Sequence, residues 1–311
     1  MKKNVIQKVN HVVDRLNFKF NYLIANTIMK NYVDSKNNYF NIMDDFDLVD
    51  KIVNDNMSFS RFGDGELSLI LEKKFDLNFQ YNSEKLRKKL SEVLNSNLPN
   101  LIIGINRSFN NPDIYNEKVQ KNCRTFNYLY REKFKTIIPK DKIYGNSSIT
   151  RFYIDFDNQD ITGAESRINN LKRIWKNRDL LIVEGIHSKL GVGNDLFFES
   201  NSIKRIIVPE TNAFDKYQDI LDNILHHVND GQLVLLAVGP TATILAYDLA
   251  KNNIQSVDVG HVDVEYEWMK LRTDKRVSIK GKYVNEIKGK KYEETDNIDK
   301  EYIESIISKV L

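Results

Sequence analysis

The feature that most constrains the fold is a set of short apolar runs that are hydrophobic on both faces. Leu180–Val183 and Leu233–Val238 contain no alternating polar residues, which is typical of parallel strands covered by helices on each side of a sheet. Further β-rich runs predict strands at 58–62, 101–105, 142–145, 205–208 and 256–259. Helical patterns fit between them, at 83–94, 114–134, 165–175, 214–228 and 241–251. We therefore expect an α/β, Rossmann-like, mostly parallel sheet with helices on both faces.

The chain divides by pattern into three parts. Residues 1–43 carry apolar residues at helical spacing with lysines and arginines between them, which predicts an N-terminal amphipathic helical extension. This extension would either pack on the main domain or lie on a membrane surface or a partner. Residues 44–277 form the α/β domain, and 278–311 form a basic tail that ends in a short helix at 299–310.

Composition excludes several classes of protein. A chain of 311 residues with 41% hydrophobic and 29% charged residues indicates a folded globular protein. A net charge of only +3, with no clustered basic face, argues against a nucleic acid partner. The single cysteine, Cys123, precludes an internal disulfide. No run reaches the roughly 18 apolar residues of a membrane span, and no signal-peptide pattern follows Met1. We expect a cytoplasmic protein, at the inner face of the membrane if residues 1–43 contact lipid.

Two carboxylates follow the first predicted strand of the α/β domain. In open α/β sheets the ligand lies at the carboxyl ends of the strands, and Gly63-Asp64-Gly65-Glu66 comes directly after strand 58–62. Oxygen ligands suit Mg²⁺ or Mn²⁺, which keep open positions for substrate phosphates. A tight turn in which Asp64 or Glu66 caps a helix is equally consistent with the pattern.

Other strand ends carry residues suited to a nucleotide diphosphate. Gly239, Pro240 and Thr241 open a predicted helix whose free N–H groups can bind phosphate, although an ordinary helix cap looks the same. Gly191 and Gly193 form a loop that lets backbone approach a nucleotide or makes a simple turn. Three polar side chains at or beyond strand ends complete this set: Arg61, Asn146 and Arg151. An arginine fork suits phosphate, and a structural ion pair is the alternative for each arginine.

An acid–base group follows the last predicted strand. His261 is a candidate general base or metal ligand, because the ordinary pKa of histidine lies near neutrality. Glu267 is the other candidate base, and Asp263 is placed to orient His261. A lone loop histidine usually has no such role, but the neighbouring acids favour one here. No pattern for a Ser-His-Asp triad, a zinc site or a redox pair supports other chemistry.

Four blocks of the sequence resemble one known family. The stretch Phe59–Leu67 resembles the opening motif of the bacterial GT-D type glycosyltransferases, which were formerly described as a domain of unknown function. Three later stretches resemble further blocks of that family in the same order: 183–196, 239–243 and 260–268. The ordered match covers about residues 45–275 and is therefore more specific than any single motif.

The resemblance implies a Rossmann-like fold, a UDP-sugar donor and a divalent metal, Mn²⁺ or Mg²⁺, held by Asp64 and Glu66. Known members extend glycans on bacterial surface adhesins or build surface polysaccharides. We therefore predict transfer of a hexose from a UDP-sugar to a glycan or glycoprotein acceptor. Two alternatives remain open, namely a metal-dependent phosphoester or nucleotide-sugar hydrolase and a non-catalytic nucleotide-sugar-binding subunit.

Overall fold

The computed structural model describes residues 20–27, 39–110, 112–157, 160–287, 292 and 300–311. The chain forms two compact units. The helical unit comprises Met1–Asn41 and Arg107–Lys142, and the sheet unit comprises Ile42–Asn106 and Ile143–Leu311. Most of the predicted N-terminal extension, 1–43, lies outside the described residues; within the described part, residues 20–27 are helical.

The helical unit is organised around α5 (Glu117–Lys135) and a preceding 3₁₀ turn, η1 (Arg107–Phe109). Aromatic side chains from both elements pack together. The ring of Phe109 lies 6.1 Å from that of Phe126 and 5.4 Å from that of Phe134, between centroids. Since aromatic rings bury large apolar areas, this cluster supplies the unit with its own core.

The sheet unit contains a parallel sheet, which confirms the predicted fold class. Its strands are β2 (Ser58–Arg61), β3 (Leu101–Ile105), β4 (Ile143–Asn146), β5 (Asp179–Gly185), β6 (Ser202–Val208), β7 (Leu233–Ala237), β8 (Ser256–Asp258) and β9 (Ile306–Lys309). They run in the order β4-β3-β2-β8-β7-β5-β6-β9, and each neighbouring pair is parallel. The short strand β1 (Asn41–Ile42) spans the boundary between the units.

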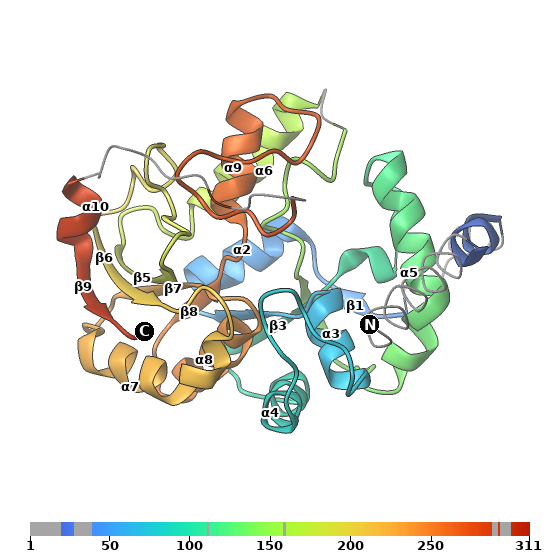
Figure 1. The fold of residues 1–311 in the computed structure, drawn as a ribbon, viewed down its shortest axis with the longest axis horizontal. Coiled ribbons are helices and arrows are strands. Elements are labelled where there is room, and N and C mark those ends of the chain that lie inside the picture. Colours follow the sequence, from blue (N-terminus) through green and yellow to red (C-terminus); the bar gives the residue numbers. More distant parts are fainter. Residues whose placement is uncertain (1–19, 28–38, 111, 158–159, 288–291, 293–299) are drawn as a thin grey trace, which may run out of the picture. The chain divides into compact units, whose positions relative to one another are not determined.

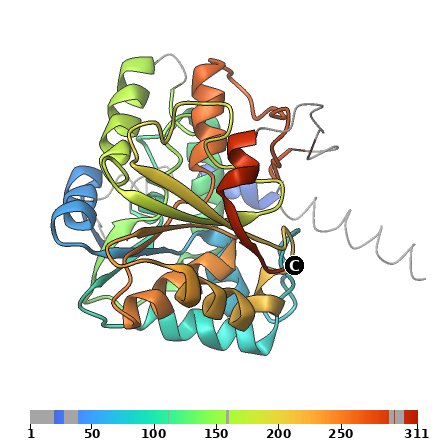
Figure 2. The ribbon, with the colours of Figure 1, turned by 90° about the vertical axis from the view of Figure 1, so that its left-hand side faces the viewer.

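Helices cover both faces of this sheet (Figures 1 and 2). One face carries α3 (Asp64–Leu71), α4 (Glu84–Leu94), α7 (Tyr217–His227) and α8 (Pro240–Lys251), with the 3₁₀ turn η2 (Ala213–Lys216) leading into α7. The other face carries α2 (Asp45–Asn54), α6 (Ile161–Lys172) and α9 (Val262–Lys270), and α10 (Lys300–Ser305) packs beside β6 and β9. Because helices shield both faces, the side chains of Leu180–Val183 in β5 are all 0% exposed.

The last part of the chain differs from its predicted form. The helix expected at 299–310 ends at Ser305, and Ile306–Lys309 instead adds β9 to the sheet beside β6. This pairing is long-range, so helical spacing of apolar residues does not reveal it. Ile279 and Val284, in the segment interpreted as a tail, are buried members of the core.

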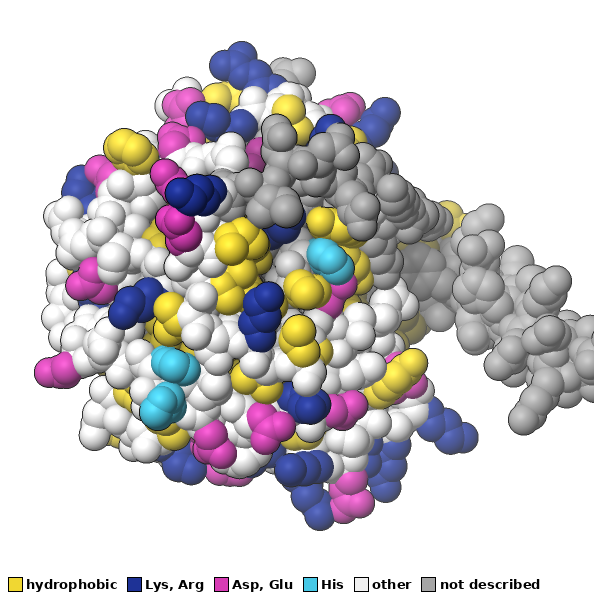
Figure 3. All heavy atoms as spheres, turned by 60° about the vertical axis from the view of Figure 1, so that its left-hand side comes forward, with side chains coloured by type: hydrophobic (Ala, Val, Ile, Leu, Met, Phe, Trp, Pro, Cys, Tyr) yellow, Lys and Arg dark blue, Asp and Glu magenta, His cyan; other side chains and the backbone are white. Residues whose placement is uncertain are grey.

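No helix among the described residues is both long and apolar enough to cross a membrane. On the face seen in Figure 3, basic and acidic side chains of the described residues are interspersed, which is typical of an ordinary solvated surface.

The topological switch point of the sheet, where the order in which strands are added reverses, lies between β2 and β8. These strands are neighbours, with Phe59 paired to Val257. After β2 the chain enters α3 on one face, and after β8 it enters α9 on the opposite face (Figure 1). Ligands of open α/β sheets bind outside the carboxyl ends of strands at such a point. The topology therefore directs attention to the residues that follow Arg61 and Asp258.

The buried position of β5 has a direct consequence for stability. Replacing Ile182, which is 0% exposed, with alanine should lower the free energy of unfolding by about 2–5 kcal/mol, because a cavity remains. The matched control is Ile143→Ala at the start of β4, which is 63% exposed and should change it by no more than about 0.5 kcal/mol. Urea denaturation followed by circular dichroism measures both, and equal losses would contradict the described packing.

Candidate functional site

The turn that follows β2 brings two carboxylates to the start of α3. Gly63 precedes the helix, and its N–H donates to Glu66 Oε2 at 2.9 Å. Asp64 is exposed and Glu66 is half-buried. This burial raises the pKa of Glu66 to about 7, and the negative charges of Asp258 and Asp64 also raise it. Glu66 Oε2 therefore caps the start of α3, as the alternative to metal binding predicts, and Glu66 Oε1 takes no part in this hydrogen bond.

The carboxylates of Asp64 and Glu66 are the candidate metal ligands at this turn. Among the described residues, no group of three or more His, Cys, Asp or Glu side chains is placed to hold a metal ion. Asp64 and Glu66 offer oxygen atoms alone, which suits hard cations such as Mg²⁺ or Mn²⁺. Mg²⁺ commonly takes one or two carboxylates and completes its coordination with water and substrate phosphates. The oxygen atoms of this pair are of the kind that such a shared site uses, and metal binding by Asp64 and Glu66 stays a prediction.

Arg61 joins three segments at the end of β2. Its Nη1 donates to Ser147 O at 3.0 Å and to Thr150 Oγ1 at 2.5 Å. Its Nη2 lies 3.1 Å from Asp258 Oδ1 at the end of β8. Gly260 packs so closely that a Cβ atom there would lie 1.9 Å from Nη2. The structural ion pair is thus what the geometry shows for Arg61, and contact with a phosphate stays a prediction.

His261 lies beside these strand ends, immediately before α9. Its Nε2 is 3.1 Å from Glu286 Oε1. Burial lowers the pKa of His261 to about 4; Glu286 opposes this shift, and the positive charges of Arg151, Arg61 and Arg276 add to it. Near neutral pH the imidazole is therefore uncharged and able to accept a proton.

Glu286 sits at the centre of a cluster of charges. Its carboxylate forms a short ion pair with Arg151, and its Oε2 lies 3.3 Å from Arg276 Nε. Although burial raises the pKa of Glu286, the charges of Arg151, His261 and Arg276 lower it to about 2. Arg151 also approaches Glu265 Oε1, at 3.8 Å. The structural ion pair is thus what the geometry shows for Arg151, and its contact with the donor diphosphate stays a prediction.

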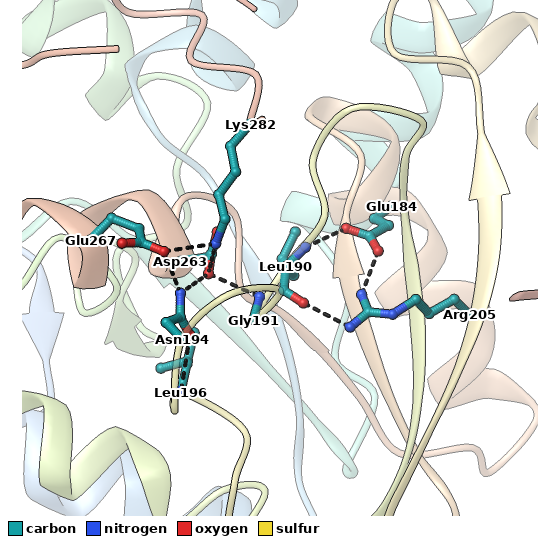
Figure 4. A network of polar contacts seen from close by, with 9 residues as sticks. All are labelled: Glu184, Leu190, Gly191, Asn194, Leu196, Arg205, Asp263, Glu267 and Lys282. Carbon is teal, nitrogen blue, oxygen red and sulfur yellow. Dashed lines mark hydrogen bonds and ion pairs between the residues drawn. The ribbon is translucent and has the colours of Figure 1, made fainter. Parts of the chain in front are cut away.

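Asp263 and Glu267 project from α9 toward a buried lysine. Lys282 Nζ lies 2.7 Å from Asp263 Oδ2 and 3.0 Å from Glu267 Oε1. Asn194 Nδ2 donates to the same two carboxylates, at 2.8 and 2.7 Å (Figure 4). The hydrogen bonds found for Asp263 go to Gly191, Asn194 and Lys282, and its orienting role toward His261 stays a prediction. Glu267 as the base stays a prediction.

A second buried ion pair holds the neighbouring loop. Glu184 Oε1 pairs with Arg205 Nη1 at 2.5 Å, and both side chains are almost fully buried. The N–H of Leu190 donates to Glu184 Oε2 at 2.7 Å, and its carbonyl accepts from Arg205 Nη2 at 2.8 Å (Figure 4). The loop that starts at Leu190 is therefore anchored to β5 and β6.

The two glycines of this loop have different surroundings. Gly191 has φ +72° and donates its N–H to Asp263 Oδ1 at 2.9 Å. A Cβ atom at Gly191 would lie 2.3 Å from Phe197, so close packing requires glycine. Gly193 has φ +79° and open space around it. The contacts found for Gly191 maintain the loop, and the approach of either glycine to a nucleotide stays a prediction.

The predicted helix start at Gly239 is confirmed. Pro240 is the first residue of α8, and Gly239 precedes it with φ +57°. A Cβ atom at Gly239 would lie 2.7 Å from the ring of Phe79. Thr241 is 0% exposed, and its Oγ1 has no hydrogen-bond partner among the described residues. Diphosphate binding at this helix start stays a prediction.

Asn146 serves the turn that follows β4. Its Nδ2 donates to Asp45 Oδ1 at 3.0 Å, and its Oδ1 accepts from the N–H of Ser148 at 3.1 Å. Both bonds are local to the sheet unit and stabilise the turn. The contacts found for Asn146 therefore stabilise the turn, and its contact with the donor stays a prediction.

Sequence reasoning missed several residues of this region. Lys282 and Glu286 lie in the segment interpreted as a basic tail, and no local pattern marks their pairing with residues of α9 and the loop before it. Asp258 did carry a signal, because an acidic residue in an otherwise buried strand needs a partner. That partner is Arg61, whose side chain is 16% exposed against 6% for Asp258.

Comparison with known proteins establishes the family. Residues 59–287 match the family model of the glycosyltransferase GT-D fold. A solved structure described as the domain of unknown function 1792, with a distinct glycosyltransferase fold, is 32% identical and superposes with a TM-score of 0.81 over 87% of this chain and 96% of its own. A new glycosyltransferase from Streptococcus sanguinis is 33% identical, with a TM-score of 0.80 over 88% and 100% of the two chains.

Two curated proteins show the same relationship. Glycosyltransferase GlyD of Streptococcus pneumoniae is 35% identical over 245 residues, which cover 76% of this chain and 29% of GlyD. The probable glycosyl transferase Gly of Streptococcus gordonii is 34% identical over 240 residues, covering 76% and 34%. The chain thus spans about a third of the length of the curated relatives it matches. It belongs to the glycosyltransferase family with the GT-D fold, which confirms the resemblance.

The buried lysine provides a test of the site's framework. Lys282→Met should lower the free energy of unfolding by about 3–5 kcal/mol, because Asp263 and Glu267 then lose their buried cation. The control Lys280→Met removes an exposed lysine two residues earlier and should cost no more than about 0.5 kcal/mol. Equal stability of the two variants in thermal and urea denaturation would show that the network does not hold α9.

Proposed function

We propose that this protein transfers a hexose from a UDP-sugar to a glycan or glycoprotein acceptor, with a divalent metal ion, in the synthesis of bacterial surface glycans. The observation that carries the proposal is the place of Asp64 and Glu66 at the end of β2, next to the end of β8 that carries His261. Membership of the glycosyltransferase GT-D fold family supports it. Ligands of open α/β sheets bind at a topological switch point, and the switch point between β2 and β8 supports a donor nucleotide at this edge.

Departure of the diphosphate is the step that most needs positive charge. When the nucleotide-sugar bond breaks, negative charge develops on the diphosphate oxygens, and a Mg²⁺ or Mn²⁺ ion bound there would neutralise it. Asp64 and Glu66 would hold that ion through carboxylate oxygens. The raised pKa of Glu66, about 7, means that the carboxylate becomes fully charged only above neutral pH unless a cation favours the charged form.

The acceptor hydroxyl must lose its proton as its oxygen bonds to the sugar. His261 is neutral near neutral pH and so has a lone pair free for that proton; its pKa of about 4 makes it a weak base, and the charge of Glu286 raises that pKa. Glu267 remains the second candidate, because only its Oε1 is engaged by Lys282 and Asn194. The products are then the glycosylated acceptor, UDP and the protonated base.

The activity itself is tested by release of UDP from a panel of UDP-sugars in the presence of Mn²⁺, with and without candidate glycan acceptors. We expect one sugar to support UDP release that rises with acceptor concentration. Release of free sugar at a rate unaffected by any acceptor would instead identify a hydrolase. Tight UDP binding with no turnover across the panel would identify a binding subunit.

The metal assignment is tested by Glu66→Gln. This change should reduce transfer by about 100-fold or more, since a lost metal ligand removes several kcal/mol of charge stabilisation, and should weaken metal-dependent UDP binding in calorimetry. Glutamine can still accept the hydrogen bond from Gly63, so the helix start should persist. The control Glu165→Gln changes an exposed glutamate of α6 and should leave transfer unchanged. Full activity of Glu66→Gln would refute the assignment.

A further inference from the structure

We infer that Glu286 is a positioning residue for His261: its carboxylate, beside Nε2, favours the hydrogen on that nitrogen and leaves Nδ1 as the atom that takes the acceptor's proton. The inference rests on the proposed function, because it names the reacting atom of the proposed base. Glu286 lies outside every motif that the sequence singles out, in the segment between the core residue Val284 and the end of the family match at 287.

The position of Glu286 beside one ring nitrogen favours one place for the hydrogen of the imidazole. His261 Nε2 and Glu286 Oε1 are 3.1 Å apart. An ionised carboxylate has only acceptor atoms, so its negative charge favours the N–H on the near nitrogen, Nε2, over a lone pair there. A neutral imidazole has a single N–H, and Nδ1 then presents a lone pair.

The carboxylate of Glu286 is itself held firmly. Arg151 pairs with Oε1 and Arg276 Nε lies 3.3 Å from Oε2, so both oxygens have a cationic neighbour. The side chain of Glu286 is only 11% exposed. These contacts keep the carboxylate charged and leave its rotamer little freedom, which are the two conditions for orienting a second side chain.

His261 in turn is fixed beside the reacting region and is still accessible. The preceding residue, Gly260, has φ +46° and packs against the guanidinium of Arg61, at the end of β2. The side chain of His261 is 35% exposed. Part of the ring is therefore accessible from outside the protein.

The charge of Glu286 also favours the protonated product. The charged groups that face His261 are Glu286, Arg151, Arg61 and Arg276. Glu286 is the anion in this set, so it stabilises the imidazolium that forms when the proton arrives. The aspartate of a Ser-His-Asp triad acts on its histidine in the same way. Without this anion, three arginines would disfavour the imidazolium.

Removal of the Glu286 charge should not unfold the cluster. Arg151 retains Glu265 at 3.8 Å, and Arg276 retains Asp155 at 2.9 Å. Glu286→Gln therefore leaves each arginine with a carboxylate, and the variant is suitable for measurement. Glu286→Asp keeps the charge but shortens the reach of the side chain.

The first experiment does not depend on activity. Nitrogen NMR of the full-length protein with ¹⁵N-labelled histidine, assigned with His261→Gln, should show His261 as the Nε2–H tautomer with a pKa well below that of free histidine. In Glu286→Gln the pKa should fall further, because an anion is lost. A wild-type Nδ1–H tautomer, or an unchanged pKa in the variant, would overturn the inference.

The second experiment uses transfer kinetics. Glu286→Gln should lower kcat by at least about 10-fold, with the donor KM unchanged, and should move the acid limb of the kcat/KM profile to lower pH. Glu286→Asp should recover part of kcat, and Glu199→Gln, at a half-exposed glutamate paired with Lys176, should behave as wild type. A loss of kcat without movement of the acid limb, together with a lower Tm, would show a structural role only. If the wild type transfers no sugar, the proposed function fails, and the NMR result still decides the position of Glu286.

Discussion

The buried ion pair between Arg61 and Asp258 joins the two strand ends on which the candidate site depends. The pair spans 3.1 Å between β2 and β8, and Arg61 also binds the turn after β4. β2 leads into α3 on one face of the sheet, and β8 leads into α9 on the other. The carboxylates at the start of α3 and the imidazole before α9 therefore belong to segments that cover opposite faces. Loss of either partner would leave a buried charge at the point where both sets of residues meet.

The short segment 282–286 holds α9 and the residue before it in place. Lys282 pairs with Asp263 and Glu267 of that helix, and Glu286 contacts His261 just before it. The segment packs through apolar side chains such as Val284. Lys282 and Glu286, four positions apart, thus contact α9 and the histidine that precedes it. The segment is therefore part of the candidate site, although its composition is that of a tail.

Burial separates the groups that maintain the framework from those that can meet a substrate. Glu184, Arg205 and Lys282 are at most 5% exposed, and their donors and acceptors are engaged within the protein. Such pairs contribute more to a defined geometry than to net stability, since desolvation offsets much of their attraction. Asp64 is exposed and His261 is 35% exposed. These two are therefore the residues from which contact with donor and acceptor is expected.

The sequence by itself determined the class of fold and the strand ends that carry Asp64, Glu66 and His261, because hydrophobic runs and turn residues act locally and leave a local pattern. Only the tertiary structure decided which charges pair. Arg151 meets Glu286 across 135 residues, and Lys282 meets Asp263 across 19, and neither ion pair is visible in the sequence, which offered a diphosphate contact for Arg151 and an orienting role for Asp263. Coulomb attraction and hydrogen bonding depend on distance through space, which the spacing of residues along a chain does not encode.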